Sequence, residues 1–361
     1  MTRTVFKSSP ALMKAAKVAV REVLAVKKDE HVLIITNPKR DVYRIAKALY
    51  TANVNAGAST TLVIQQRKTS FDYAEPSVIN AIKTEPEVII SISDERMGKD
   101  KETLANPYKE HDGATYTHIF DYLLYETKKI RAFWSPKVTA EMFTKTVPID
   151  YVAMRKRCAR IENELQNKKE VRVRTDLGTD VVIGVKGRKP KVDDGNFTIP
   201  GNGGNLPAGE VFISPQLGAS HGTIVFDGSI TLDETLVIKK PIKVEIEKGF
   251  VTKIDGEKEA KKLAKYLDLA EKKPLQMMKK GELDKTKAEE YSKNAHHIGE
   301  LGIGTNPNAN IVGNVLEDEK VLGTVHFAIG SNYDHDASAL IHSDGIVKKP
   351  TITVDGKPLK P

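Results

Sequence analysis

HVLIIT, residues 31 to 36, is a short apolar run that opens the pattern on which the fold depends. DVYRIAKALYTANVNAG (41–57) follows, and its apolar residues recur at helical spacing. STTLVIQ (59–65) is expected to be the next strand, a helix is expected near 76–84, and EVIISIS (87–93) is expected to be a third strand. This order of strands and helices predicts an α/β domain with a mostly parallel sheet and flanking helices.

Further local features of this first part of the chain can be predicted from its sequence. Gly57 follows the first of these helices and is the expected cap of its C-terminus. THIFDY (117–122) and RAFWS (131–135) are expected to be further short strands. NPKRD (37–41) contains no glycine, and no helical segment follows GNGGN (201–205), so the glycine patterns of dinucleotide and P-loop sites are not present there.

The texture of the sequence changes after PIDYVAMRKRCARIENELQN (148–167), a helical segment that ends in a polar run. EVRVRTDLGTDVVIGV (170–185) and IKVEIEKGFVTKIDG (242–256) each alternate apolar and polar residues around a turn, which predicts hairpins. TITVDGKPL (351–359) is a third turn-rich piece, and EKEAKKLAKYLDLAEKK (257–273) is a charged helix. We therefore predict an N-terminal α/β domain, residues 1–165, and a C-terminal α+β domain with antiparallel strands, residues 166–361.

Charge and cysteine content narrow the class of protein. The formal net charge is +8, but the lysines alternate with acidic residues, as in GEKEAKK (256–262). That mixture favours a solvated surface of the thermophile kind over a nucleic-acid site. The one cysteine, Cys158, is expected to pack in a helix in a reducing compartment. No apolar run approaches the roughly 20 residues that span a bilayer, so we expect a cytoplasmic protein with no membrane partner.

Histidines and carboxylates concentrate in the second half. HHIGELGIGTNPNA (296–309) places two histidines and Glu300 beside three glycines, and ALIHSDGIV (339–347) places His342 two residues before Asp344. Because side chains two apart lie on one face of a strand, this pair can offer a nitrogen and an oxygen to one metal ion. Glu210, Glu319, His326 and Tyr333 are further candidates for the same site.

Each candidate also has an ordinary structural explanation. Glu210 suits a solvated strand end, Glu300 a loop, and His326 a hydrogen-bonded position in an apolar run. Tyr333 alone would be a packing residue. It is difficult for these separate explanations to apply to every candidate in one domain. The concentration of histidines and carboxylates therefore favours a metal-binding site.

The motifs NLPAGEVF, IGELGIGTN, GTVHFAIG and HSD resemble those of the aminopeptidase T/aminopeptidase S family of metallopeptidases (M29). This resemblance implies that two divalent metal ions, Zn, Co or Mn, are held by six ligands, and that Tyr333 assists as a phenol. It implies a homodimer acting on short peptides. The mixed charge pattern, for its part, predicts no nucleic-acid partner. Glu300 is expected to bridge the two ions and the shared water to attack the peptide carbonyl. The implied ligands are Glu210, Glu300, Glu319, His326, His342 and Asp344.

The chain is also similar to 2,5-dihydroxypyridine dioxygenases, which share this fold and use one ferrous ion. That resemblance implies a site of two histidines and one carboxylate, supplied here by His297, His342 and Asp344. Glu210 and Glu300 match positions that are not carboxylates in the dioxygenase pattern, so their presence favours the aminopeptidase hypothesis. A non-catalytic binding protein on the same fold is the third alternative.

Overall fold

The computed structural model describes residues 5–109 and 115–359. The chain divides into two compact units. The first unit comprises residues 1–151 and 195–208, and the second comprises residues 152–194 and 209–361. The predicted boundary near residue 165 differs from this division, because almost all of the long helix at 151–165 belongs to the second unit and a later segment returns to the first.

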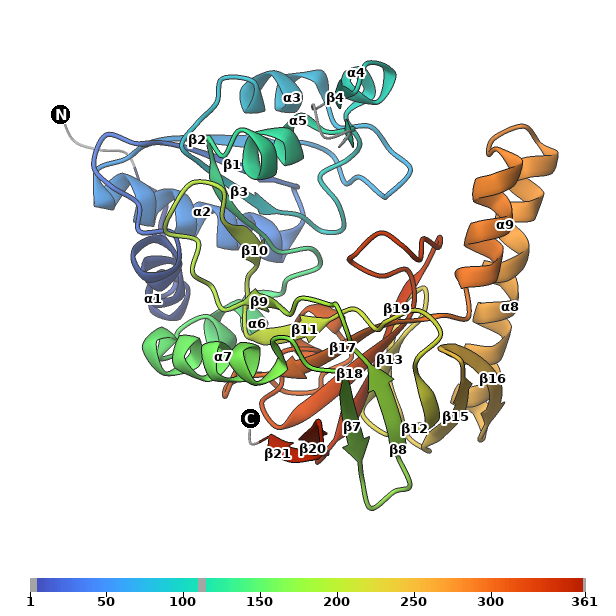
Figure 1. The fold of residues 1–361 in the computed structure, drawn as a ribbon. Coiled ribbons are helices and arrows are strands. Elements are labelled where there is room, and N and C mark those ends of the chain that lie inside the picture. Colours follow the sequence, from blue (N-terminus) through green and yellow to red (C-terminus); the bar gives the residue numbers. More distant parts are fainter. Residues whose placement is uncertain (1–4, 110–114, 360–361) are drawn as a thin grey trace. The chain divides into compact units, whose positions relative to one another are not determined.

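The first unit is built on a five-stranded sheet in the order β10-β6-β3-β1-β2, and every neighbouring pair is parallel (Figure 1). The mixed α/β class with a parallel sheet is therefore confirmed. Its elements are α1 (Pro10–Val18), η1 (Ala19–Val23), β1 (His31–Thr36), α2 (Arg40–Ala56), β2 (Ser59–Ile64), α3 (Pro76–Ile82), β3 (Val88–Ile92), α4 (Lys101–Ala105), β4 (Tyr108–Lys109), β5 (Thr115–Tyr116), α5 (Ile119–Asp121), η2 (Tyr122–Glu126), β6 (Arg131–Trp134), α6 (Ala140–Thr146) and β10 (Gly203–Asn205).

Helices cover both faces of this sheet. Leu33 and Ile35 of β1 and Ile89 of β3 join a buried cluster with residues of α3 and α5. The α2 helix packs against β1 and β3 and contributes nothing to that cluster, so it covers the opposite face (Figure 1). The strand β3 is buried along its whole length, as expected for a parallel strand with helices on both sides.

Two local predictions in this unit have different outcomes. Gly57 caps α2 with φ of 97°, the left-handed conformation that glycine adopts without strain, so the predicted cap is confirmed. The predicted strand THIFDY is wrong, because this segment forms α5 and the start of η2. The Asp100 carboxylate accepts a hydrogen bond from the Ile119 amide, and the His118 imidazole accepts one from the Phe120 amide. Polar side chains therefore satisfy the free amides in the first turn of this helix.

A buried ion pair joins the start of β6 to the residue before β1, and its contribution to stability can be tested. The Arg131 guanidinium donates to both carboxylate oxygens of Glu30, at 3.1 and 2.6 Å, and to the Leu24 carbonyl. Burial opposes the charged form, but Arg131 outweighs it and lowers the pKa of Glu30. We expect Glu30→Gln to reduce the free energy of unfolding by roughly 2 kcal/mol, below the value for a fully buried pair because Glu30 is partly exposed.

Urea titration of both proteins measures this loss. Because the pKa of Glu30 is lowered in the folded state, its stabilisation is present above the unfolded pKa and disappears as pH falls through the folded pKa. The difference between wild type and variant should therefore shrink in acid. Glu85→Gln removes the exposed partner of Lys129 and should change stability by under about 0.5 kcal/mol. Equal losses in both variants would contradict the assignment.

The second unit contains two seven-stranded sheets whose neighbouring strands are all antiparallel. Their orders are β14-β13-β19-β18-β17-β11-β9 and β16-β15-β12-β8-β7-β20-β21. The elements are α7 (Tyr151–Leu165), β7 (Glu170–Arg174), β8 (Asp180–Gly184), β9 (Lys191–Asp193), β11 (Glu210–Ile213), β12 (His221–Phe226), β13 (Ser229–Thr231), β14 (Thr235–Val237), β15 (Ile242–Glu247), β16 (Phe250–Asp255), α8 (Lys258–Lys279), α9 (Lys285–Asn294), β17 (Ile298–Gly304), α10 (Val315–Asp318), β18 (Thr324–Gly330), β19 (His342–Lys348), β20 (Thr351–Val354) and β21 (Lys357–Leu359).

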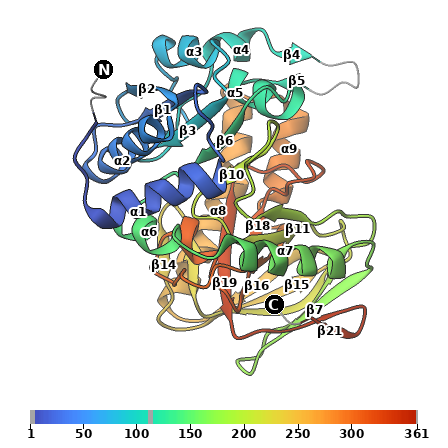
Figure 2. The same ribbon diagram turned by 90° about the vertical axis from the view of Figure 1, so that its left-hand side faces the viewer.

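The two hairpins predicted for this unit are confirmed as β7–β8 and β15–β16. The turn-rich piece at 351–359 forms a further hairpin, β20–β21. The charged segment after residue 257 forms α8, which lies beside α9 in both views (Figures 1 and 2). Cys158 of α7 is buried with its Sγ 3.2 Å from the Thr305 hydroxyl, and burial raises the pKa of its thiol to about 12, which agrees with a packing role. Among the helices of the described ranges, none combines the length and apolar character that a bilayer crossing requires.

Candidate metal centre

Four neighbouring strands of one sheet carry five of the six predicted ligands, and Glu319 follows α10. Glu210 begins β11, Glu300 lies in β17, His326 lies in β18, and His342 and Asp344 lie in β19. These strands are adjacent in the order β19-β18-β17-β11. Ala328 of β18 pairs with Glu300 on one side and with Asp344 on the other, so both carboxylates stand at the same level of the sheet. The antiparallel register therefore brings together residues that are up to 134 positions apart in the chain.

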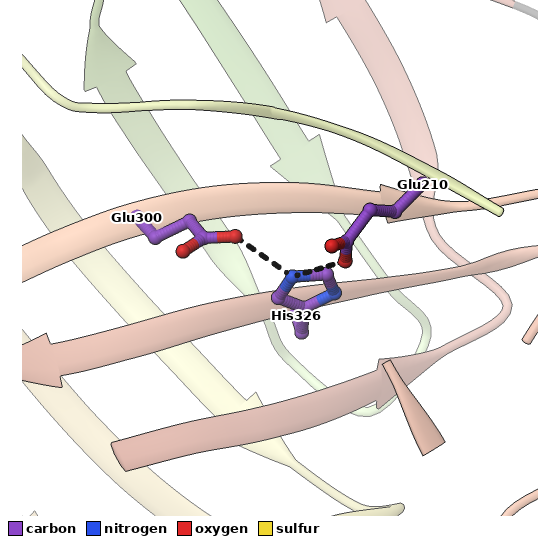
Figure 3. Close-up of side chains that lie close together, drawn as sticks. All are labelled: Glu210, Glu300 and His326. Carbon is purple, nitrogen blue, oxygen red and sulfur yellow. Dashed lines mark hydrogen bonds and ion pairs between the residues drawn. The ribbon is translucent and has the colours of Figure 1, made fainter. Parts of the chain in front are cut away.

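Glu300 is at the centre of this group. Its Oε1 lies 3.0 Å from Nε2 of His326, and its Oε2 lies 3.1 Å from Nε2 of His342. On the far side of His326, Oε2 of Glu210 lies 3.5 Å from the same Nε2 (Figure 3). Nε2 of His342 also lies 3.3 Å from Oδ1 of Asp344. Glu300 thus connects two imidazoles, as a bridging carboxylate would.

A glycine makes room for the His326 ring. Gly302 pairs with His326 across β17 and β18, and a Cβ on Gly302 would lie 1.9 Å from Nε2 of His326. The imidazole therefore lies directly over the backbone of β17, in space that any larger residue would fill. This close approach explains part of the glycine content of IGELGIGTN.

The chemistry of the donors suits a metal ion. Glu210, Glu300, His326 and Asp344 are each less than a tenth exposed. Oε2 of Glu210 and Oδ1 of Asp344 are buried, accept no hydrogen bond, and meet only a histidine nitrogen. Buried carboxylate oxygens of this kind need a cation. The carboxylate and imidazole donors present here are ligands that divalent first-row metals accept.

Three overlapping groups of donors lie close enough to share an ion. Within each group, one donor atom per residue lies within 4.8 Å of the others. Glu300, His326 and Asp344 each belong to two of these groups, so the three groups form one continuous cluster. The groups are Glu210 with Glu300 and His326, Glu300 with His342 and Asp344, and Glu319 with His326 and Asp344.

The charge state of Glu300 follows from its neighbours. Burial opposes ionisation of Glu300, but the bonds from His326 and His342 outweigh it and lower the pKa of this carboxyl to about 2. Glu300 is therefore a carboxylate at neutral pH. An ionised carboxylate between two imidazoles is ready to accept a cation without first losing a proton.

Tyr333 lies at the side of this centre. Its ring centroid is 5.1 Å from that of His342 and 5.0 Å from that of Phe212, and the residue is 44 % exposed. The ring therefore borders the site on a side that solvent reaches. Its predicted role as a catalytic or ligating phenol stays a prediction.

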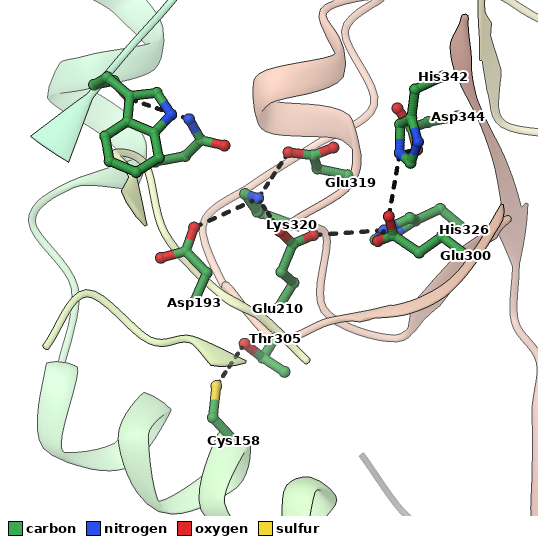
Figure 4. A network of polar contacts seen from close by, with 12 residues as sticks. Cys158, Asp193, Glu210, Glu300, Thr305, Glu319, Lys320, His326, His342 and Asp344 are labelled. Atoms are coloured by element: carbon green, nitrogen blue, oxygen red, sulfur yellow. Dashed lines mark hydrogen bonds and ion pairs between the residues drawn. The ribbon is translucent and has the colours of Figure 1, made fainter. Parts of the chain in front are cut away.

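Lys320 is a member of this network that the sequence did not reveal. Its side chain is fully buried, and its Nζ lies 2.5 Å from Oε1 of Glu210 and 2.7 Å from Oε1 of Glu319 (Figure 4). Asp193 lies 3.6 Å away on a third side. Burial favours the neutral amine, but these three carboxylates outweigh it and raise the pKa of Lys320 above its ordinary value. In the sequence, LEDEK (316–320) is indistinguishable from a solvated charge run.

His297 lies outside the donor groups found in the described residues. It is 1 % exposed, its ring centroid lies 5.3 Å from that of Phe250, and neither ring nitrogen has a hydrogen-bond partner. Burial lowers the pKa of this imidazole to about 4. His297 is therefore not grouped with His342 and Asp344, its expected partners in a ferrous site, whereas Glu300 is grouped with them.

Comparison with known proteins assigns the chain to a family. Residues 135–360 match the family model NicX, described as 2,5-dihydroxypyridine 5,6-dioxygenase. The chain belongs to this family. A 2,5-dihydroxypyridine 5,6-dioxygenase of Pseudomonas putida KT2440 is 33 % identical over 115 residues. That alignment spans 31 % of this chain and only 33 % of the relative, or about a third of its length.

Two solved structures share the fold. The 2,5-dihydroxypyridine dioxygenase from Pseudomonas putida KT2440 aligns over 98 % of this chain and 99 % of its own, with a TM-score of 0.70 and 17 % identity. AmpT from Thermus thermophilus aligns over 97 % of both chains, with a TM-score of 0.64 and 16 % identity. At these identities the likeness concerns the fold, so the fold shared by both resemblances is confirmed.

The aminopeptidase hypothesis was wrong. The NicX match covers most of the catalytic half, whereas AmpT is a structural neighbour at low identity. Buried glutamates at positions 210 and 300 are present in a chain of the dioxygenase family, so they do not identify an aminopeptidase. The chain still belongs to a family of enzymes, and its structure contains donor groups that could hold a metal ion.

Proposed function

We propose that this protein is a metal-dependent dioxygenase that opens a hydroxylated heteroaromatic ring of the dihydroxypyridine kind. The NicX family match over residues 135–360 carries the proposal. The metal would be held by Glu300, His342 and Asp344, a mixed group of one imidazole and two carboxylates. An iron(II) ion in such a site supplies the redox chemistry with dioxygen.

The residues around the ion would do the remaining work. Glu300 accepts a hydrogen bond from Nε2 of His326 at 3.0 Å and so fixes the orientation of that imidazole. Nδ1 of His342 donates to the Ser331 carbonyl at 2.9 Å, which leaves Nε2 of His342 free to bind the ion. This set departs from the usual two-histidine, one-carboxylate pattern, and His326 is the nearby second imidazole. Tyr333 and Phe212, with ring centroids 5.0 Å apart, form an aromatic surface next to His342. A planar heteroaromatic substrate can pack against such a surface.

Oxygen consumption tests this proposal. The protein is stripped of metal, loaded with Fe(II) without oxygen, and then given 2,5-dihydroxypyridine and dioxygen. We expect one dioxygen to be consumed per substrate, together with loss of the ring absorbance. The control is Glu271→Gln, which alters the exposed donor group of Asp268, Glu271 and His296 and should leave this reaction unchanged. No oxygen uptake, with release of p-nitroaniline from aminoacyl-p-nitroanilides instead, would refute the proposal.

A further inference from the structure

Lys320 occupies one side of the donor cluster as a fixed positive charge. It directly follows Glu319, at the end of α10, and its whole side chain is enclosed. Its ammonium is within 2.7 Å of oxygens from both Glu210 and Glu319, and 3.6 Å from Asp193 (Figure 4). A buried lysine with three carboxylates around it occupies the kind of space that a metal ion takes in a cluster of acids.

The contacts of Lys320 separate the three donor groups. The group of Glu300, His342 and Asp344 contains no residue in contact with this lysine. Each of the other two groups depends on a residue that Lys320 contacts, Glu210 in one case and Glu319 in the other. A metal ion in either of those groups would therefore share a carboxylate with the ammonium and be repelled by it.

The two carboxylate oxygens of Glu210 have different partners. Its Oε1 is taken by Lys320 at 2.5 Å, while its Oε2 faces His326 at 3.5 Å. The carboxylate is thus neutralised from within the protein on the side where a second ion would bind. Because an ammonium donates three hydrogen bonds and accepts none, it satisfies these oxygens without leaving a coordination position open.

We propose that the Lys320 ammonium takes the place of a second metal ion, so that the pocket holds one divalent cation, at Glu300, His342 and Asp344. This inference rests on the proposed metal-dependent function and adds to it the reason for a single ion. It assigns Lys320 a positioning role: this lysine holds Glu210 and Glu319 in place of a metal and leaves one group free.

Metal counting on the unaltered protein is the first test. The chain is treated with chelator, dialysed against excess Mn(II) or Co(II), and analysed for metal per chain. We expect about one tightly bound ion. Two tightly bound ions per chain would overturn the inference, whatever the oxygen assay shows. One ion without oxygen consumption would refute the proposed reaction and leave the role of Lys320 standing.

Removal of the ammonium is the second test. We expect Lys320→Met, purified with Mn(II) present, to bind about two ions per chain, and its thermal midpoint to rise with Mn(II) concentration more steeply than that of wild type. Lys320→Arg keeps a cation and should stay at one ion. Lys68→Met removes a part-buried lysine paired with Glu75 in the other unit and should also stay at one.

A Lys320→Met protein that holds one ion or none would overturn the inference. If this variant does not fold, the metal count of wild type decides the question alone. Metal content and thermal midpoint are independent of turnover, so neither result depends on finding the correct substrate.

Discussion

Replacing Gly302 by alanine is expected to weaken metal binding strongly without changing any ligand. The added Cβ would lie 1.9 Å from Nε2 and 2.1 Å from Cε1 of His326, far inside van der Waals contact. His326 is fully buried in β18, and packed interiors leave little room for a ring to move. Either the ring or the strand must shift, and the ring then loses its bond to Glu300.

The expected magnitudes follow from overpacking and from the loss of the hydrogen bond by which His326 orients Glu300. Extra volume in a packed site typically costs about 1–3 kcal/mol, so Gly302→Ala should remain folded but be less stable. Disturbing the groups that orient ligands lowers metal affinity about 10- to 100-fold, and displacing His326 should reach at least the upper value. Metal affinity by competition with a chromophoric chelator, and stability by urea titration, measure the two effects separately.

Gly218→Ala is the matched control. Gly218 has φ of 73°, and a Cβ added there would meet nothing within 4 Å, so alanine strains the backbone without touching a side chain. It should cost about 1–2 kcal/mol and leave metal affinity unchanged. If Gly302→Ala kept wild-type affinity, His326 would not be held against β17 as described, and the candidate centre would lose one of its donors.

Local sequence patterns were sufficient to predict most helices and strands, but not the whole metal centre. The strand at 31–36 and the helix ending at Gly57 could be predicted because their periodicity and capping are local. THIFDY could not, because its helical start depends on Asp100, which is 19 residues before Ile119. The boundary near 165 missed the return of 195–208 to the first sheet, a long-range pairing with no local signal.

The donors and the lysine show the same limit at the site itself. Glu300, His342 and Asp344 were identifiable because carboxylates and histidines concentrate in short strands. Lys320 was not, because its burial depends on Glu210, 110 residues away, and on Asp193. His297 has the residue type of a ligand and sits three positions from Glu300, yet its ring faces Phe250. Proximity in sequence is therefore a weak guide to ligand sets.

Glu300→Gln should have the largest effect of any single ligand substitution. Glutamine has nearly the same shape but no charge, and one of its two terminal atoms is a donor. It can therefore accept from only one of His326 and His342, whereas the carboxylate contacts both. We expect metal affinity to fall by at least about 100-fold and oxygen consumption to become undetectable, while the circular dichroism spectrum is retained.

Glu210→Gln is the comparison variant for this prediction. Both residues are buried glutamates on neighbouring strands, and both contact His326. Only Glu300 belongs to the donor group that Lys320 does not touch. If one ion sits in that group, Glu210→Gln should lower affinity by less than about tenfold, because the lost charge is paired with the ammonium and not with the metal. The reverse order of affinities would place the ion next to Glu210 and His326, and Lys320 would then have to move away from Glu210 when the metal binds.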